Sequence, residues 1–135
     1  MISTEAAIAL RDAGLVWQPA SGDRFQLDEP EFEADVFTVS EMTIEPRQYP
    51  TGTILAFNGT TEWALDSVAL GDALWLPRED QLREMLRSAF RSLRRLADTH
   101  RVEIELAGEM QAFEHPQPEG AYAAAVLALL QRITG

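Results

Sequence analysis

The sequence predicts an α+β domain in which an antiparallel sheet packs against N-terminal, central and C-terminal helices. Segments rich in β-branched and aromatic residues occupy the first half and return near residue 102. Three other segments place apolar residues at helical spacing. The order helix, three or four strands, helix, two strands, helix is typical of a sheet covered by helices on one face. The 135 residues hold no internal repeat or long linker, so we expect one domain over residues 1–135.

The first helix is expected over about residues 4–13. Ser3 offers an N-cap hydroxyl, and Gly14 stands where a left-handed C-cap residue is common. Pro19 and Gly22 then indicate a connection, after which the segment RFQL is expected to form a brief strand.

A β-meander is expected over about residues 35–45, 52–57 and 60–65. Asn58-Gly59 lies between the last two strands and is a strong hairpin signal, because a type I′ turn needs positive φ at both central residues. In the alternative, residues 60–67 form a helix, since short mixed runs fit both structures.

The clearest helical pattern follows Pro77, which suits a first helical turn. Apolar residues recur every three or four positions while arginines take the other side, so one helix is expected over about residues 78–97. The apolar positions are Leu82, Met85, Leu86, Ala89, Phe90, Leu93, Leu96 and Ala97, and the arginines are Arg83, Arg87, Arg91, Arg94 and Arg95.

Two strands and a helix are expected to complete the chain. Val102, Ile104 and Leu106 alternate with polar residues, and MQAFEH can return as an antiparallel partner, which gives a hairpin. The closing helix carries an apolar stripe formed by Tyr122, Ala125, Val126, Leu129, Leu130 and Ile133.

Composition excludes several kinds of chemistry. All 11 basic residues are arginine, so Schiff-base and Walker-type lysines are absent, and there is no cysteine for thiolate chemistry. The net charge of -11 disfavours binding to nucleic acid. Glu5 stands where a secretory signal needs positive charge, and no apolar run reaches about 18 residues, so we expect a cytoplasmic protein without a membrane partner.

No complete catalytic or metal-binding motif is present. His100 and His115 lack the spacing of H-E-x-x-H, and His100 is expected at a helix end. The acidic run at Glu29, Glu31, Glu33 and Asp35 is expected to be a solvated loop. We therefore expect no catalytic residue, no metal and no cofactor, and a binding role is favoured over an enzymatic one.

Two groups of residues are candidates for binding. Trp63 and Trp75, with Glu62 and Asp66, could line an aromatic cleft with carboxylates, although large aromatic residues more often pack in a core. The second group comprises Arg83, Arg87 and Arg91, which could bind an acidic partner or the acidic half of a second copy.

These candidates give two of three functional hypotheses. In the first, the chain is an interaction module for a protein partner or for itself, as a homodimer. In the second, it is a small-molecule binding domain or an enzyme that uses the aromatic and carboxylate cleft.

The third hypothesis comes from a resemblance. The segments LRDAGL, DVFTVSEMTIE, FNGTTEWALDS and LWLPREDQLREML resemble a group of short uncharacterised proteins, mainly actinobacterial, some of which carry a pilus-assembly label. The resemblance extends to about residue 96. It implies a common small domain of unknown role, with pilus assembly as the function that the label suggests. Because no G-x-x-x-x-G-K-[ST] loop is present, it implies no nucleotide-binding residue.

Overall fold

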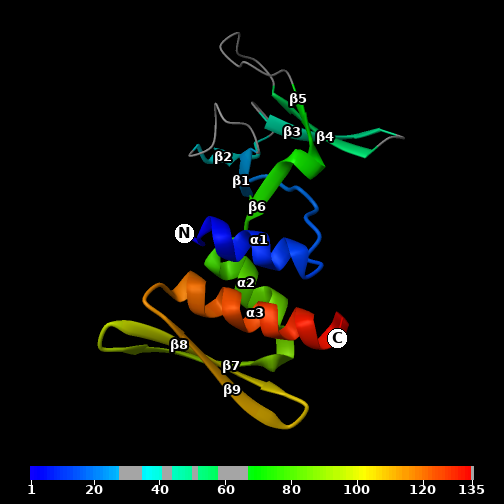
Figure 1. The fold of residues 1–135 in the computed structure, drawn as a ribbon. Coiled ribbons are helices and arrows are strands. Elements are labelled where there is room, and N and C mark those ends of the chain that lie inside the picture. Colours follow the sequence, from blue (N-terminus) through cyan, green and yellow to red (C-terminus); the bar gives the residue numbers. More distant parts are fainter. Residues whose placement is uncertain (28–34, 41–43, 50–51, 58–66, 135) are drawn as a thin grey trace. The chain divides into compact units, whose positions relative to one another are not determined.

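A computed structural model describes residues 1–27, 35–40, 44–49, 52–57 and 67–134 of the chain. These residues form three α-helices and three three-stranded antiparallel sheets, which confirms the α+β class (Figure 1). They divide into two compact units, one of Met1–Val16 with Pro77–Gly135 and the other of Trp17–Leu76. A single domain over residues 1–135 stays a prediction.

The unit Trp17–Leu76 contains two sheets. In the first, β1 (Arg24–Leu27) lies between β2 (Phe37–Thr38) and β6 (Ala73–Leu76), which confirms the brief strand at RFQL. The second has the order β3-β4-β5, and the 3-10 turn η2 follows it. The bounds are Ile44–Tyr49 for β3, Gly52–Phe57 for β4, Ser67–Ala69 for β5 and Leu70–Asp72 for η2.

The predicted meander is confirmed in part. Strand β4 has the predicted bounds, but the predicted single strand over residues 35–45 is wrong, because β2 and β3 belong to different sheets. Strand β2 pairs back with β1, whereas β3 pairs with the next strand, β4, so the two ends of this run join different sheets. The Asn58-Gly59 hairpin and the alternative helix over 60–67 fall mainly on residues 58–66, which lie outside the described residues.

An aromatic cluster forms the core of the first sheet. Phe25 is fully buried, and its ring lies 5.5 Å from Trp17 and 5.6 Å from Phe37, measured between ring centroids. Trp75 stacks on Trp17 at 6.2 Å. Leu27, Val39 and Ala73 complete the cluster. Aromatic rings at these separations add favourable edge and face contacts to the burial of apolar area.

The other unit packs helices against the third sheet. Helix α1 (Thr4–Asp12) begins where the Ser3 hydroxyl accepts a hydrogen bond from the Ala6 N–H, as predicted. The sheet consists of β7 (Phe90–Leu96), β8 (Thr99–Leu106) and β9 (Glu109–His115).

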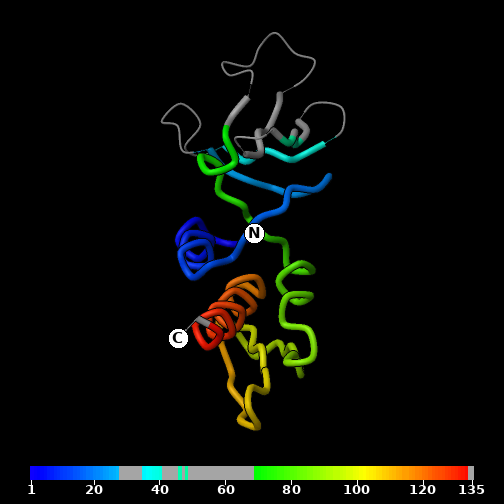
Figure 2. The backbone as a smooth tube through the Cα atoms, turned by 90° about the vertical axis from the view of Figure 1, so that its right-hand side faces the viewer, coloured from blue at the N-terminus to red at the C-terminus, as the bar shows by residue number. Residues whose placement is uncertain are grey.

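Helix α3 (Pro118–Thr134) is central to this unit. It packs on β8 and β9 and also contacts α1 and the helix α2 (Glu79–Leu86) (Figures 1 and 2). The face of β8 with Val102, Ile104 and Leu106 is buried, as its alternation predicted. The closing helix and the hairpin of β8 and β9 are therefore confirmed.

The predicted single helix over residues 78–97 is wrong beyond residue 86. Helix α2 ends at Leu86, the 3-10 turn η3 spans Arg87–Ala89, and β7 follows directly. Arg87 ends the helix with φ 49° and ψ -126°, a conformation that residues other than glycine rarely adopt. Beyond it, the chain pairs with β8 instead of continuing as a helix.

Candidate functional site

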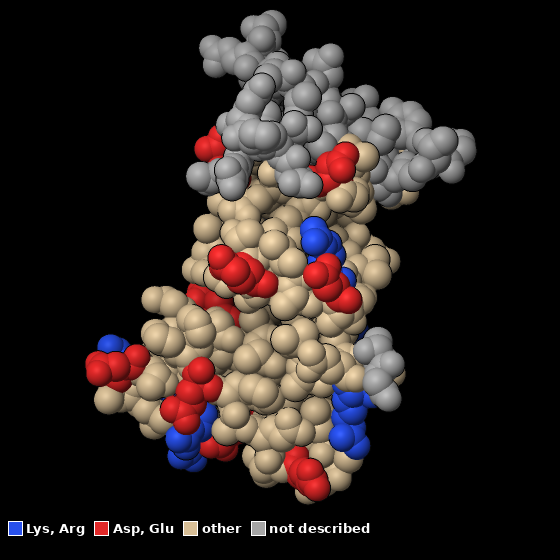
Figure 3. All heavy atoms as spheres, in the orientation of Figure 1, with Lys and Arg blue, Asp and Glu red and all other residues tan. Residues whose placement is uncertain are grey.

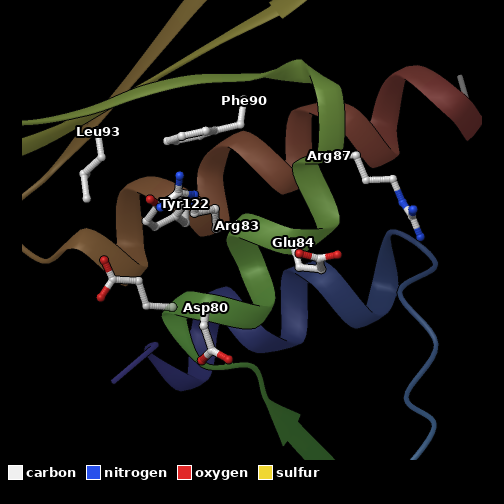
Figure 4. A pocket seen from close by; sticks show the side chains of 8 residues that line it. Asp80, Arg83, Glu84, Arg87, Phe90, Leu93 and Tyr122 are labelled. Atoms are coloured by element: carbon white, nitrogen blue, oxygen red, sulfur yellow. The ribbon is translucent and has the colours of Figure 1, made fainter.

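An open depression of about 560 Å³ lies between α2 and β7 (Figure 4). Helix α2 and the residue that follows it form one wall, β7 contributes two apolar side chains, and α3 contributes one tyrosine. The lining residues are Glu79, Asp80, Arg83, Glu84, Arg87, Phe90, Leu93 and Tyr122. All belong to the same compact unit.

Aromatic side chains form the floor of this depression. Phe90 stacks on Tyr122 with 5.9 Å between ring centroids, and Tyr122 is only 1% exposed. The Arg83 guanidinium carbon lies 4.5 Å from the centre of the Phe90 ring, within the range of a cation–π contact. Leu93 remains 37% exposed beside them, and Figure 4 shows it with Phe90 directed from β7 toward Tyr122 and Arg83. The floor therefore offers apolar surface next to a positive charge.

The acidic residues of α2 lie on one side of the depression. Asp80 pairs with the Arg78 guanidinium at 3.1 Å, and this hydrogen bond lowers the pKa of the Asp80 carboxyl below its ordinary value. Glu79 and Asp80 occupy the first turn of α2, where negative charge is stabilised by the helix dipole. These carboxylates are thus explained by the helix that carries them.

Positive charge accumulates along β7. Arg94 lies opposite Arg101 and Arg95 opposite His100 in the register of β7 and β8. Arg101 is paired with Glu114 at 3.0 Å. Among the residues that the structure describes, neither Arg94 nor Arg95 forms an ion pair. Arg94 and Arg95 are therefore exposed cations of β7 for which the described part of the chain supplies no carboxylate.

The structure brings only some of the predicted site residues together. Arg83 and Arg87 line the same depression, but Arg91 lies at a bulge in β7 and pairs with Glu105 at 2.8 Å. The expected arginine stripe on one helix is therefore wrong, because the arginines are divided among α2, η3 and β7. Over the strands, basic and acidic side chains lie next to one another on the face shown in Figure 3.

The predicted aromatic cleft is only partly described. Trp75 is half-buried in the aromatic cluster and stacks on Trp17, so it packs in a core, as the alternative expected. Glu62, Trp63 and Asp66 lie outside the described residues. The cleft stays a prediction.

Only weak sequence signals point to the other residues of the depression. The sequence pattern predicts a helical stripe for Phe90 and Leu93, and the core face of the last helix for Tyr122. Only the pairing of β7 with β8 and the packing of α3 bring the three together. An aromatic residue on each segment was the one available signal.

The two histidines are cross-strand neighbours. His100 lies opposite His115 in β8 and β9, so its predicted place at a helix end is wrong. The Gln117 N–H donates to His115 Nδ1 at 2.9 Å, just before α3 begins, and His100 Nδ1 lies 3.0 Å from the Pro116 carbonyl oxygen. A Cβ on Gly120 would clash with the His115 imidazole, so glycine permits the close approach of this ring. In the described part of the chain, no three His, Asp or Glu side chains come together as metal ligands would.

Asp23 is a buried carboxylate that the sequence did not single out. It is 3% exposed, and its Oδ2 accepts hydrogen bonds from Trp17 Nε1 at 2.9 Å and from the Ala20 N–H at 3.0 Å. Its backbone also bonds to Val39. Asp23 therefore joins the turn before β1 to the aromatic cluster, which is a structural role.

The stability of the protein is expected to fall at alkaline pH because of Tyr122. Burial raises the pKa of the Tyr122 phenol, Arg83 lowers it and Glu79 raises it further. A raised pKa in the folded state means that the stabilisation is complete below the unfolded value near 10 and is lost as the pH rises through the folded value. Urea unfolding between about pH 8 and 11 should show this loss, and Tyr122→Phe should reduce it. An identical pH profile in Tyr122→Phe would assign the loss to other groups.

None of the helices in the described ranges combines the length and apolar character needed to cross a membrane. Comparisons of the chain with protein-family models, with curated proteins and with solved structures found no match.

Proposed function

We propose that this chain is a protein-interaction module that binds an acidic segment of a partner protein in the depression between α2 and β7. One observation carries the proposal: Arg83 is held over the Phe90 ring beside the exposed Leu93. Arginine and aromatic residues are enriched at the centres of protein interfaces, where they contribute most of the binding energy.

The shape of the depression favours a protein segment over a small molecule. It is broad and open, with one wall on a helix and the other on a strand. Sites for small molecules usually enclose most of the ligand surface. An open surface with an apolar floor and charged walls instead suits a chain that lies across it.

The local charge attracts an acidic partner even though the whole chain is acidic. The lining itself is mixed, with Glu79, Asp80 and Glu84 on α2 beside Arg83 and Arg87, and Asp80 is already paired with Arg78. The excess of positive charge lies toward β7, because residues 83–95 hold five arginines and a single acid, Glu84. At physiological ionic strength, charges are screened beyond roughly 8 Å, so the nearest groups dominate the interaction. Arg87, at the end of α2, extends the positive surface beyond the aromatic floor.

The proposal is tested with an array of immobilised ten-residue peptides that vary in acidic and apolar content. The labelled protein should bind best to peptides that are both acidic and apolar, and binding should weaken as salt is added. The double variant Arg83→Glu, Arg87→Glu should lose at least about tenfold in affinity, because each arginine would provide a charge-assisted contact.

The matched control is Arg132→Glu, which reverses an exposed charge in the last turn of α3. Circular dichroism should show that each variant keeps its fold. Equal binding by the wild type and the double variant would refute the proposed function, as would a preference for basic peptides.

A further inference from the structure

We infer that the bound segment adds to the free edge of β7 as a fourth strand of the sheet β7-β8-β9, and that it carries adjacent acidic residues followed by one apolar residue. This inference rests on the proposed function and specifies the partner: an extended acidic segment of another protein, held by backbone hydrogen bonds as well as by side chains.

Strand β7 has the free edge that such addition needs. The sheet order is β7-β8-β9, and no other strand in the described part of the chain pairs with β7. The strand is seven residues long, which is enough to pair with a peptide of ordinary strand length. An edge strand presents unpaired N–H and C=O groups to any extended chain beside it.

The depression adjoins β7, the strand that carries this edge. Phe90 and Leu93 belong to β7, while the opposite wall is α2 and the residue after it. A segment added to β7 would therefore run between β7 and α2 and cover the aromatic floor. Strand addition next to a helix combines backbone hydrogen bonds for affinity with pockets for alternate side chains.

The register of β7 decides which partner side chains meet which surface. Leu93 lies opposite the buried Val102, so it faces the helices, and Arg95 points to the same side. Arg94 points to the other side of the sheet. Successive side chains of an added strand would meet Arg95, Arg94 and Leu93 in turn.

Charge determines the chemistry of the first two positions. Arg94 and Arg95 are both exposed, and each lies opposite a basic or potentially basic side chain of β8. Carboxylates on an added strand would place negative charge beside both arginines and could form charge-assisted hydrogen bonds with them. The third position lies beside Leu93, which is 37% exposed and borders the floor formed by Phe90 and Tyr122, so an apolar side chain fits there.

A second copy of β7 does not satisfy these requirements. Strand Phe90–Leu96 contains three arginines and no acid, so pairing between two copies would bring arginines together across the new edge. Opposed like charges are unfavourable in a strand pair. The occupant is therefore a segment of a different sequence with the opposite charge.

The test uses a fluorescein-labelled peptide with the sequence Gly-Ser-Thr-Glu-Glu-Leu-Thr-Val-Ser-Gly, amidated at its C-terminus. In an antiparallel arrangement, Glu-Glu-Leu can lie opposite Arg95, Arg94 and Leu93. Fluorescence anisotropy should show saturable binding. Replacing Glu-Glu with Gln-Gln, or Leu with Ser, should raise Kd by about tenfold or more, because each change removes one of the contacts that define the site.

Backbone methylation separates strand addition from simple charge attraction. The central residues of the peptide are N-methylated one at a time, which removes one N–H donor without changing the charge. Because alternate N–H groups of a strand point to the same neighbour, the affinity should fall at every second position only. If the acidic peptide binds and methylation at all positions has no effect, strand addition is wrong but the proposed function survives. Failure of acidic peptides to bind at all would refute both.

A charge exchange tests the position of the peptide. Arg94→Glu and Arg95→Glu should each weaken binding by about tenfold, and Arg132→Glu should not. A peptide in which both Glu residues are replaced by Lys should bind the Arg94→Glu, Arg95→Glu double variant better than it binds the wild type. No gain from this exchange, in a variant with an unchanged circular dichroism spectrum, would refute the assignment of β7.

A wild-type dimer that Arg94→Glu dissociates would show that a second copy covers this edge, and would also refute the assignment.

Discussion

Asp23→Ala is expected to lower the free energy of unfolding of the unit Trp17–Leu76 by about 2–4 kcal/mol. The Asp23 carboxylate is buried and accepts hydrogen bonds from Trp17 Nε1 and from the Ala20 N–H. Removing it leaves two donors without this acceptor, one of them on a side chain that is itself buried. An unsatisfied buried donor costs more than the net value of the hydrogen bond that it once made.

Urea unfolding measures this loss. The near-ultraviolet circular dichroism of the tryptophans provides the signal, because Trp17 and Trp75 stack in the same cluster. Asp72→Ala is the matched control, since Asp72 lies in the same unit and is exposed. Asp23→Asn keeps one carbonyl oxygen for the two donors and should lose less than Asp23→Ala. A loss for Asp23→Ala no larger than that for Asp72→Ala would contradict the structural role of this carboxylate.

The regular parts of the fold could be predicted because their signals are local. Helix α1 has a serine cap and helix formers, α3 has a long apolar stripe, and β8 alternates strictly between apolar and polar residues. The stripe of α3 has the helical period of about 3.6 residues, and the alternation of β8 has the strand period of 2. Each pattern therefore fits only one kind of secondary structure. These three elements therefore appear close to their predicted positions.

The prediction for β7 failed because the local pattern of its sequence is that of a helix. Phe90, Leu93 and Leu96 recur every three residues, as in a helix, and arginine and leucine favour helices. The strand forms because β8 supplies a partner through a two-residue turn, and tertiary pairing overrides propensity. The helix ends at Arg87 with a positive φ. A positive φ at the end of a helix is usually indicated by a glycine in the sequence. Because this position is an arginine, the sequence does not indicate that the helix ends there.

Only part of the candidate site can be predicted from the sequence, because its residues come from segments that meet only in the folded chain. Arg83 and Arg87 are binding candidates from the sequence, and both line the depression. Its aromatic floor was missed because Phe90 and Tyr122 are 32 positions apart in the sequence and meet only through packing. Asp23 was missed because nothing local separates one buried carboxylate from the 22 acidic residues of the chain.

Tyr122→Ala is expected to cause the larger loss of stability, about 3–5 kcal/mol in the unit that contains α2, α3 and β7. The side chain is 1% exposed, stacks on Phe90 and comes from the helix that contacts α1, α2 and the sheet. Alanine would remove the ring and leave a cavity where these elements meet. Such cavities cost more than the lost transfer free energy alone, because the surroundings collapse only in part.

A second variant separates the ring from its hydroxyl group. Tyr122→Phe keeps the stack on Phe90 and should unfold near the wild-type urea concentration at neutral pH, whereas Tyr122→Ala should unfold at a much lower one. Phe90→Ala and the double variant complete a thermodynamic cycle, and the coupling between the two rings should be about 0.5–1.5 kcal/mol. Equal stability of Tyr122→Ala and Tyr122→Phe would mean that the ring is not a core element. In that case the depression would have no fixed floor, and the orientation of Arg83 over Phe90 would need another support.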